Sequence, residues 1–453
     1  MTKSLKSLWG RFLFQGRGVL PTTRLLLLFL LVSPFLLIGT LLGDLSWFTI
    51  ITVNLFILLT SLVDLWFSPK RGQLSFSRRL PEEMERDLSY QVEIDIKNNS
   101  QHSFYFRLID DLPHSFQMEF PLSGIARKDR TTKISYQTSP SVRGKVEIEQ
   151  LFFRYRSLLG LWEKQTTIDL PNSIKVIPDL TETKQFLENA QSFLLYEGVK
   201  IRKQRSGVGD FSKIRSYVVG DDPRKINWRQ TAKLHEVMTN DYEPEHGKYI
   251  TILIDCGRMM GAELTNGNRL EKVLEASMTV AAAALQKGDY VSVLAFSKEI
   301  KVYVPPAKGM GHLKTILENI YSLHVDAVES NYPAVLHYLE MVQKKRSLLL
   351  LFSDVKTFLF EESALAYLKR LRQRHLFFMI GIEDKTLIER INEEPVDVQA
   401  AMLKSIAQQQ FLLKKREKMK WEKQGLQMIE AREEKLAAAA VSYYINMMNQ
   451  NVL

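Results

Sequence analysis

The chain has 453 residues, which is too long for one ordinary domain and predicts two or three. Hydrophobic residues make up 45% of it and charged residues 25%, and these proportions exclude long disorder and a mostly membrane-embedded transporter. The single cysteine, Cys256, excludes an intramolecular disulfide framework and a cysteine-cluster metal site. Lys and Arg (61) outnumber Asp and Glu (51), so nucleic acid and an anionic membrane surface are the partners to consider.

Two uncharged apolar runs near the N-terminus, residues 25–43 and 45–63, predict a pair of membrane-spanning helices. Each run approaches the roughly 20 residues that cross a bilayer. A signal peptide is the alternative for the first run, but its apolar stretch is long and a second follows at once. Basic residues without acidic ones precede the first run, and Lys70 and Arg71 follow the second. The positive-inside rule therefore places residues 1–24 and the chain after residue 71 in the cytoplasm.

Residues 79–178 predict a small β-sandwich. Between Tyr90 and Lys97 apolar and polar residues alternate strictly, as in a strand with one buried face. Further short apolar runs are separated by Gly, Pro, Ser or Asn, with no helical pattern between them. The segment carries no catalytic spacing of His, Cys or carboxylates, so a structural or docking module is the favoured interpretation.

Residues 179–247 are interpreted as a linker that carries a dense motif. The residues singled out as a candidate partner-binding site are Tyr217, Gly220, Asp221, Asp222, Arg224 and Trp228. Asp222 suits a helix N-cap, with Pro223 at the first helical position. Two interpretations stay open: the Arg and Trp side chains dock a partner, or the carboxylates clasp the linker through Arg215 or Arg224. We expect the Trp228 indole to pack between the two domains and Arg224 to contact a partner.

Residues 248–453 predict a doubly wound α/β domain followed by C-terminal helices. The run 249–255 suits a strand buried on both faces, and apolar strands then alternate with helical patterns. The basic residues between Lys414 and Lys423 predict a solvated helix face rather than a nucleic-acid patch, because no nucleic-acid-binding motif accompanies them. The sequence has no phosphate-binding loop, no zinc-protease motif and no nucleophile elbow, so we expect no enzyme.

The motif resembles the signature of the domain of unknown function 58 (DUF58) family. The matching residues are Tyr217, Gly220, Asp221, Asp222, Arg224, Ile226, Asn227, Trp228, Thr231 and Ala232. Pro140, Arg143, Gly144 and the stretches 159–161 and 176–178 are similar to the family's sandwich segment, whereas Ser157, Leu158 and Lys233 depart from its usual residues. The resemblance implies a membrane-anchored bacterial protein with a von Willebrand factor A-like C-terminal domain. It also implies association with a MoxR-type AAA+ ATPase.

The resemblance raises the question of a divalent cation. Von Willebrand factor A domains often bind one through an Asp-x-Ser-x-Ser motif, a Thr and a second Asp. In this chain the corresponding residues are Asp255, Ser330 and Asp354, whereas Gly257 and Met259 replace both serines. Hard cations need several oxygen ligands, so this degenerate site predicts no metal or other cofactor.

These features together predict a scaffold or adaptor in the bacterial inner membrane, with two spans and cytoplasmic soluble domains. It would work with a MoxR-type AAA+ ATPase in the assembly or maturation of envelope or other protein complexes, without binding nucleic acid. The alternative is a metal- or ligand-binding receptor module that uses the strand ends near Asp255 and Asp354.

Overall fold

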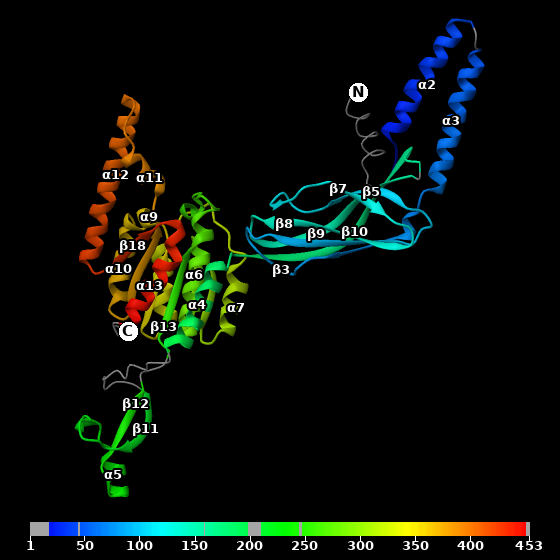
Figure 1. Ribbon diagram of the computed structural model, residues 1–453. Helices are drawn as coiled ribbons and strands as arrows, with labels where there is room; N and C mark the ends of the chain where they lie inside the picture. The colour runs from blue at the N-terminus through cyan, green and yellow to red at the C-terminus, as the bar shows by residue number, and fades with distance from the viewer. Residues whose placement is uncertain (1–17, 44–45, 158, 198–209, 244–246, 450–453) are drawn as a thin grey trace. The chain divides into compact units, whose positions relative to one another are not determined.

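The computed structural model describes residues 18–43, 46–157, 159–197, 210–243 and 247–449. The chain divides into two compact units, residues 1–177 and residues 178–453 (Figure 1).

Two apolar helices lie near the N-terminus of the first unit: α2 (Thr23–Leu41) and α3 (Trp47–Phe67). Both are long and apolar enough to cross a membrane, and most of their large apolar side chains are exposed. One polar pair joins them, because Ser33 Oγ donates to Asn54 Oδ1 at 2.8 Å. These are the two candidate spans expected from the sequence.

Two antiparallel sheets follow and pack around one core. The first has the order β1 (Gly18–Pro21), β10 (Trp162–Ile177), β9 (Gly144–Arg156), β5 (Phe104–Asp110) and β7 (Leu122–Ala126), with β3 (Glu83–Glu85) parallel to β10. The second has the order β2 (Leu74–Arg79), β4 (Tyr90–Asn98), β8 (Arg130–Pro140) and β6 (Phe116–Gln117). Alternate residues of β4 and β9, among them Ile94 and Phe153, are fully buried between the sheets.

The sandwich differs from its expected bounds because it starts at Leu74 and also includes β1 from the N-terminal segment. A buried polar network joins its two sheets. The Asp110 carboxylate of β5 pairs with Arg78 of β2 and accepts a hydrogen bond from Tyr136 Oη of β8 at 2.6 Å. Burial and the adjacent Asp110 raise the pKa of Tyr136 well above its usual value, so its hydroxyl stays protonated as a donor.

Asp64, near the end of α3, connects the apolar helices to the sandwich. Its side chain is buried and accepts hydrogen bonds from Ser157 Oγ at 2.5 Å and from the Leu159 amide at 2.8 Å. On the α2 side, Thr22 Oγ1 donates to the Gly160 carbonyl at 2.7 Å. The loop between β9 and β10 is therefore held by residues adjoining both helices.

The second unit contains a six-stranded sheet of order β15 (Ile300–Ala307), β14 (Tyr290–Phe296), β13 (Tyr249–Asp255), β16 (Ser347–Phe352), β17 (Leu376–Ile382) and β18 (Gln427–Ala431). All neighbours are parallel except β14 and β15. Helices α4 (Thr181–Glu197), α6 (Arg269–Gln286), α7 (Gly311–Ile320) and α13 (Leu436–Asn449) contribute to one apolar cluster. Helices α8 (Tyr332–Val342), α9 (Val355–Leu359), α10 (Glu362–Arg372) and α12 (Val398–Lys423) contribute to the other. The sheet is thus covered on both faces, as a buried parallel sheet requires.

Two segments differ from the sequence interpretation. Helix α4 was expected within a linker, but it packs on α6, and Thr183 Oγ1 lies 3.0 Å from Thr279 Oγ1 in a buried contact. The C-terminal part was expected to be helical, yet β18 adds an edge strand to the sheet. Gly425, with φ of 78°, permits the turn that ends α12 and frees the next residues to pair with β17.

The second unit also contains a small hairpin module. Strands β11 (Asp210–Ser216) and β12 (Met238–Glu243) pair antiparallel, and between them lie a short 3₁₀ turn, η2 (Pro223–Lys225), and helix α5 (Trp228–Leu234). Most of the sequence motif falls in this module.

The helix α11 (Lys385–Asn392) precedes α12, whose basic residues are mostly exposed. One of them, Lys418, forms an ion pair with Glu422 at 3.8 Å.

Candidate functional site

The carboxyl ends of β13 and β16 bring two predicted site residues together. Asp255 ends β13, and Asp354 follows β16, its neighbour in the sheet. Both side chains are buried. The expected proximity is therefore present, and the question is what each carboxylate binds.

Asp255 is saturated by hydrogen bonds from the protein itself. Its Oδ1 accepts from the Gly257 amide at 2.8 Å and from the Ser330 hydroxyl. Its Oδ2 accepts from Tyr332 Oη at 3.0 Å and from Ser353 Oγ at 2.5 Å. Burial raises the pKa of the Asp255 carboxyl, while these hydrogen bonds oppose that shift.

Asp354 has a different set of partners. It caps α9, accepting from the Thr357 amide at 2.8 Å and from Thr357 Oγ1 at 2.7 Å. Its other oxygen pairs with the guanidinium of Arg269, the first residue of α6, whose side chain is 11% exposed. Arg269 thus already neutralises the charge of this carboxylate.

The donor set does not fit a divalent cation. Gly257 and Met259 offer no side-chain oxygen, and the remaining carboxylates are bound by hydroxyls and by Arg269. A Cβ on Gly257 would lie 2.0 Å from Ser330 Oγ, so the hydroxyl of Ser330 occupies the space that a serine at 257 would need. Within the described residues, no group of three His, Cys, Asp or Glu side chains has the geometry to hold a metal ion.

The hairpin module carries all six motif residues that were predicted as a site. Arg215 on β11 forms a two-pronged ion pair with Asp221, with N–O distances of 2.7 and 2.8 Å. Asp221 Oδ2 also accepts from the Val218 amide at 3.0 Å, and Tyr217 Oη donates to the Asp221 carbonyl at 3.1 Å. Gly220, with φ of 110°, permits the tight turn between them. The hydrogen bond from Arg215 lowers the pKa of Asp221 to about 2.

Two capping residues shape the tip of the module. Asp222 Oδ1 accepts from the Arg224 amide at 3.0 Å, so Asp222 caps η2 as expected. Asn227 Oδ1 accepts from the Gln230 amide at 3.1 Å and caps α5, while Asn227 Nδ2 donates to Asn240 on β12 at 2.9 Å. The capping role of Asn227 was not predicted, although Asn directly before a helical run is a recognised signal.

The motif therefore divides into internal and surface residues. Asp221, Asn227 and Tyr217 form its internal bonds, whereas Trp228 is 70% exposed. The indole was expected to be packed, yet it is exposed here, because Asn227 caps α5 and Trp228 starts a helix with no buried residue. Arg224 is also exposed, as the interpretation of a contact residue requires.

Further apolar side chains are exposed on the same module. Val218, Val219, Leu234 and Val237 are 61%, 97%, 57% and 44% exposed. Together with Trp228 and the exposed Arg224, they form what we call the motif surface. Exposed apolar side chains grouped on one small module are typical of a protein-binding surface.

Comparisons with known proteins agree with the motif. Residues 213–398 match the family described as "Protein of unknown function DUF58". The chain is 22% identical over 296 residues to the uncharacterized protein YeaD of Bacillus subtilis (strain 168), an alignment that covers 63% of this chain and 71% of YeaD. The family match covers the part of the chain that carries the motif, and so agrees with the resemblance of the motif to the DUF58 family.

Two solved structures share a weaker likeness. The conserved hypothetical protein BatB from Bacteroides thetaiotaomicron is 14% identical with a TM-score of 0.30, over 45% of this chain and all of BatB. A PapD-like domain of human CEP192 is 14% identical with a TM-score of 0.19, over 24% of this chain and 89% of that domain. At these scores neither structure establishes the fold of this chain.

Proposed function

We propose that this protein is a membrane-anchored scaffold that docks protein partners through the motif surface. The supporting observation is the division of the motif described above. Its carboxylate and amide side chains are used to build the module, and its Trp and Arg side chains are left exposed. Trp and Arg are the residues that most often dominate the energy of a protein interface.

The family resemblance supplies the partner in this proposal, a MoxR-type AAA+ ATPase, which would act with the scaffold on envelope or other protein complexes. The α/β domain is proposed to be of the von Willebrand factor A kind, in which strand ends present a docking edge. Its sheet order and the position of Asp255 and Asp354 are consistent with that proposal. The Arg269–Asp354 pair would replace the cation of such domains.

The docking proposal is tested with full-length protein in detergent and a purified MoxR-type ATPase from the same organism. We expect Trp228→Ala and Arg224→Ala each to weaken binding by about 2 kcal/mol, roughly thirtyfold, with an unchanged thermal midpoint. Arg130→Ala, which removes an exposed arginine from the sandwich, serves as the control. Native-like binding by both motif variants would contradict the proposal.

Anchoring is a separate part of the proposal, with the soluble domains on the cytoplasmic side of the bacterial inner membrane. Basic residues adjoin both ends of the helical pair and support this orientation. A reporter fused after Leu453 should be active in the cytoplasm, and a reporter active only outside the membrane would contradict the orientation. Release of the protein from membranes at high pH would contradict the anchoring itself.

A further inference from the structure

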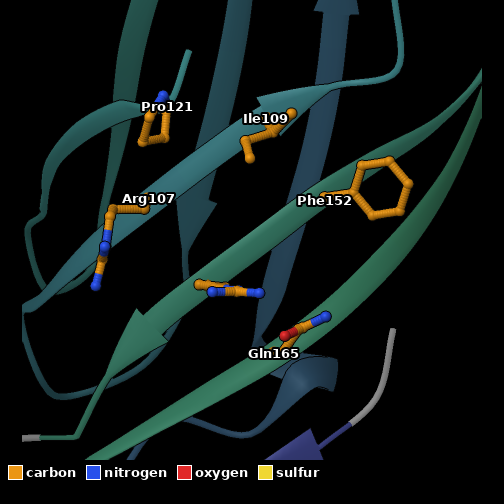
Figure 2. A pocket seen from close by; sticks show the side chains of 6 residues that line it. Arg107, Ile109, Pro121, Phe152 and Gln165 are labelled. Carbon is orange, nitrogen blue, oxygen red and sulfur yellow. The ribbon is translucent and has the colours of Figure 1, made fainter. Parts of the chain in front are cut away.

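A pocket of about 210 Å³ lies on the outer face of the sandwich. Side chains of β5, β9 and β10 and the residue before β7 line it (Figure 2); they are Arg107, Ile109, Pro121, Phe152, Arg154 and Gln165. No motif in the sequence points to these residues. They combine two cations, one amide and an apolar wall.

The two arginines are placed against each other by the strand register. Arg107 of β5 is directly opposite Arg154 of β9, and like charges in that position destabilise a sheet. Glu163 of β10 pairs with Arg107 at 3.0 Å. No carboxylate pairs with Arg154 anywhere in the described part of the chain. The pocket therefore has an excess positive charge that an anion would neutralise.

Gln165 adds a polar atom that needs a partner. It is directly opposite Arg154 on the other side of β9, and its Oε1 is buried without a hydrogen-bond partner among the described residues. With either orientation of its amide, Gln165 would complete its hydrogen bonding with a ligand that carries both donor and acceptor oxygens. A phosphate ester with neighbouring hydroxyls has such oxygens, and guanidinium groups bind phosphate through two parallel hydrogen bonds.

The apolar side of the pocket narrows the ligand class. Ile109 and Phe152 are directly opposite each other in the next row of the same ladder, and Ile109 is 44% exposed. A free inorganic anion would leave this surface uncovered, whereas an amphiphile would cover it. Figure 2 shows the Ile109 and Phe152 side chains on two neighbouring strands of the pocket.

The strand pairing also places the pocket near the first apolar helix. Gln165 pairs with Gly18 of β1, whose last residue, Pro21, pairs with Trp162 just before α2 begins at Thr23. Three residues of strand span about 10 Å. That distance is about one Debye length, over which an anionic leaflet attracts basic side chains. Arg71 belongs to the same end of the sandwich, donating to the Thr167 carbonyl at 2.9 Å.

We propose that the Arg107–Arg154–Gln165 pocket binds the phosphate group of an anionic phospholipid headgroup, with Ile109 and Phe152 against its apolar part. The headgroup source rests on the proposed membrane anchoring, whereas the phosphate chemistry of the pocket does not. Bound lipid would fix the sandwich against the leaflet next to the helical pair.

The test uses full-length protein in a non-ionic detergent, titrated separately with short-chain phosphatidylglycerol, short-chain phosphatidylcholine and inorganic phosphate. We expect phosphatidylglycerol to bind most tightly and Arg154→Gln to weaken it about fivefold. The control Arg130→Gln removes the same charge from an exposed site on β8 and should leave binding unchanged. Because Arg154 opposes Arg107, Arg154→Gln should not lower the thermal midpoint.

Equal binding of phosphatidylglycerol by native protein and Arg154→Gln would overturn the proposal that this pocket binds the phosphate group. Inorganic phosphate binding as tightly as phosphatidylglycerol, with the same loss in Arg154→Gln, would overturn the lipid source and assign free phosphate. Neither result depends on anchoring, since both titrations are made in detergent, so failure of the anchoring proposal appears separately in the membrane-release experiment.

Discussion

At the scale of single residues, Asp255 distinguishes a structural carboxylate from a ligand. Three hydroxyls and one amide donate hydrogen bonds to its oxygens. A cation would have to displace these hydrogen bonds in order to bind. The resemblance to the cation motif pointed to Asp255, Ser330 and Asp354, and a hydrogen bond joins Asp255 to Ser330. It gave no sign of Tyr332, Ser353 and Arg269, because their contacts depend on how α8, the end of β16 and α6 are placed in the fold rather than on spacing.

Replacing Asp255 should affect stability in a way that depends on the substitute. Asp255→Ala leaves buried hydroxyls without an acceptor, and we expect a loss of about 2 kcal/mol or more in unfolding free energy. Asp255→Asn should lose less. Burial raises the folded pKa of Asp255. The contribution of Asp255 to the free energy of unfolding is therefore fully present below its unfolded pKa and is lost as pH rises through the folded pKa. Chemical denaturation at a series of pH values upward from the ordinary aspartate pKa should show this dependence in native protein and not in Asp255→Asn.

Gly257→Ser tests whether the lost cation motif can be restored by one side chain. Its Cβ would lie 2.0 Å from Ser330 Oγ, so we expect a loss of about 1–3 kcal/mol and no gain of magnesium binding. Gly311→Ser is the matched control, since a Cβ there meets nothing within 4 Å. Calorimetric or thermal-shift titration with magnesium measures binding, because a thousandfold excess over Kd would stabilise the fold by about 4 kcal/mol. A large shift in native protein would revive the receptor interpretation.

At the scale of elements, the hairpin module shows how much a motif can reveal before the structure is known. The cap of Asp222 follows from local residue preferences and is present. The exposure of Trp228 could not be read in the same way, because an indole beside Ile226 suits a buried position equally well. What decides the matter is the number of residues in the module, which is too small to enclose a large ring.

The Arg215–Asp221 pair makes a prediction about the module's behaviour in acid. The folded pKa of Asp221 is lowered to about 2. The stability that the Asp221 carboxylate contributes is therefore present above the ordinary aspartate pKa and is lost as pH falls through about 2. The Val218 amide, which donates to Asp221, should therefore keep one NMR shift between about pH 6 and 4. In Arg215→Gln the same amide should begin to titrate near pH 4. Titration of Val218 near pH 4 in native protein would refute the pairing.

At the scale of the whole chain, the alternation of strands and helices predicted the α/β architecture well, because buried strands and amphipathic helices have distinct periods. The antiparallel edge β15 and the final strand β18 were not predicted. A short edge strand forms only where a neighbouring strand offers it hydrogen bonds, which the local sequence does not reveal. The strand β18 is also separated from its partner β17 by the helices α11 and α12. The N-terminal strand β1 was missed for the same reason.

The Asp64 contacts predict that the helices and the sandwich form one cooperative unit. Asp64→Ala would remove the acceptor used by Ser157, Leu159 and Leu161, and we expect a loss of about 2–3 kcal/mol. The loop between β9 and β10 should then be cleaved faster in limited proteolysis of full-length protein in detergent. Asp111→Ala, at an exposed position on the sandwich, is the control. Unchanged cleavage and midpoint in Asp64→Ala would show that the loop is held without this carboxylate.

The pairing of β1 with β10 can form only late in the protein's synthesis. Gly18 emerges from the ribosome early, whereas its partner Gln165 must wait until the rest of the sandwich has been translated. The two apolar helices lie between them in the chain. Under the proposed anchoring, the bilayer therefore receives the helices while the sandwich is incomplete, and the sheet gains its edge strand only after insertion. Such a late, long-range closure makes the membrane surface the place where this domain finishes folding.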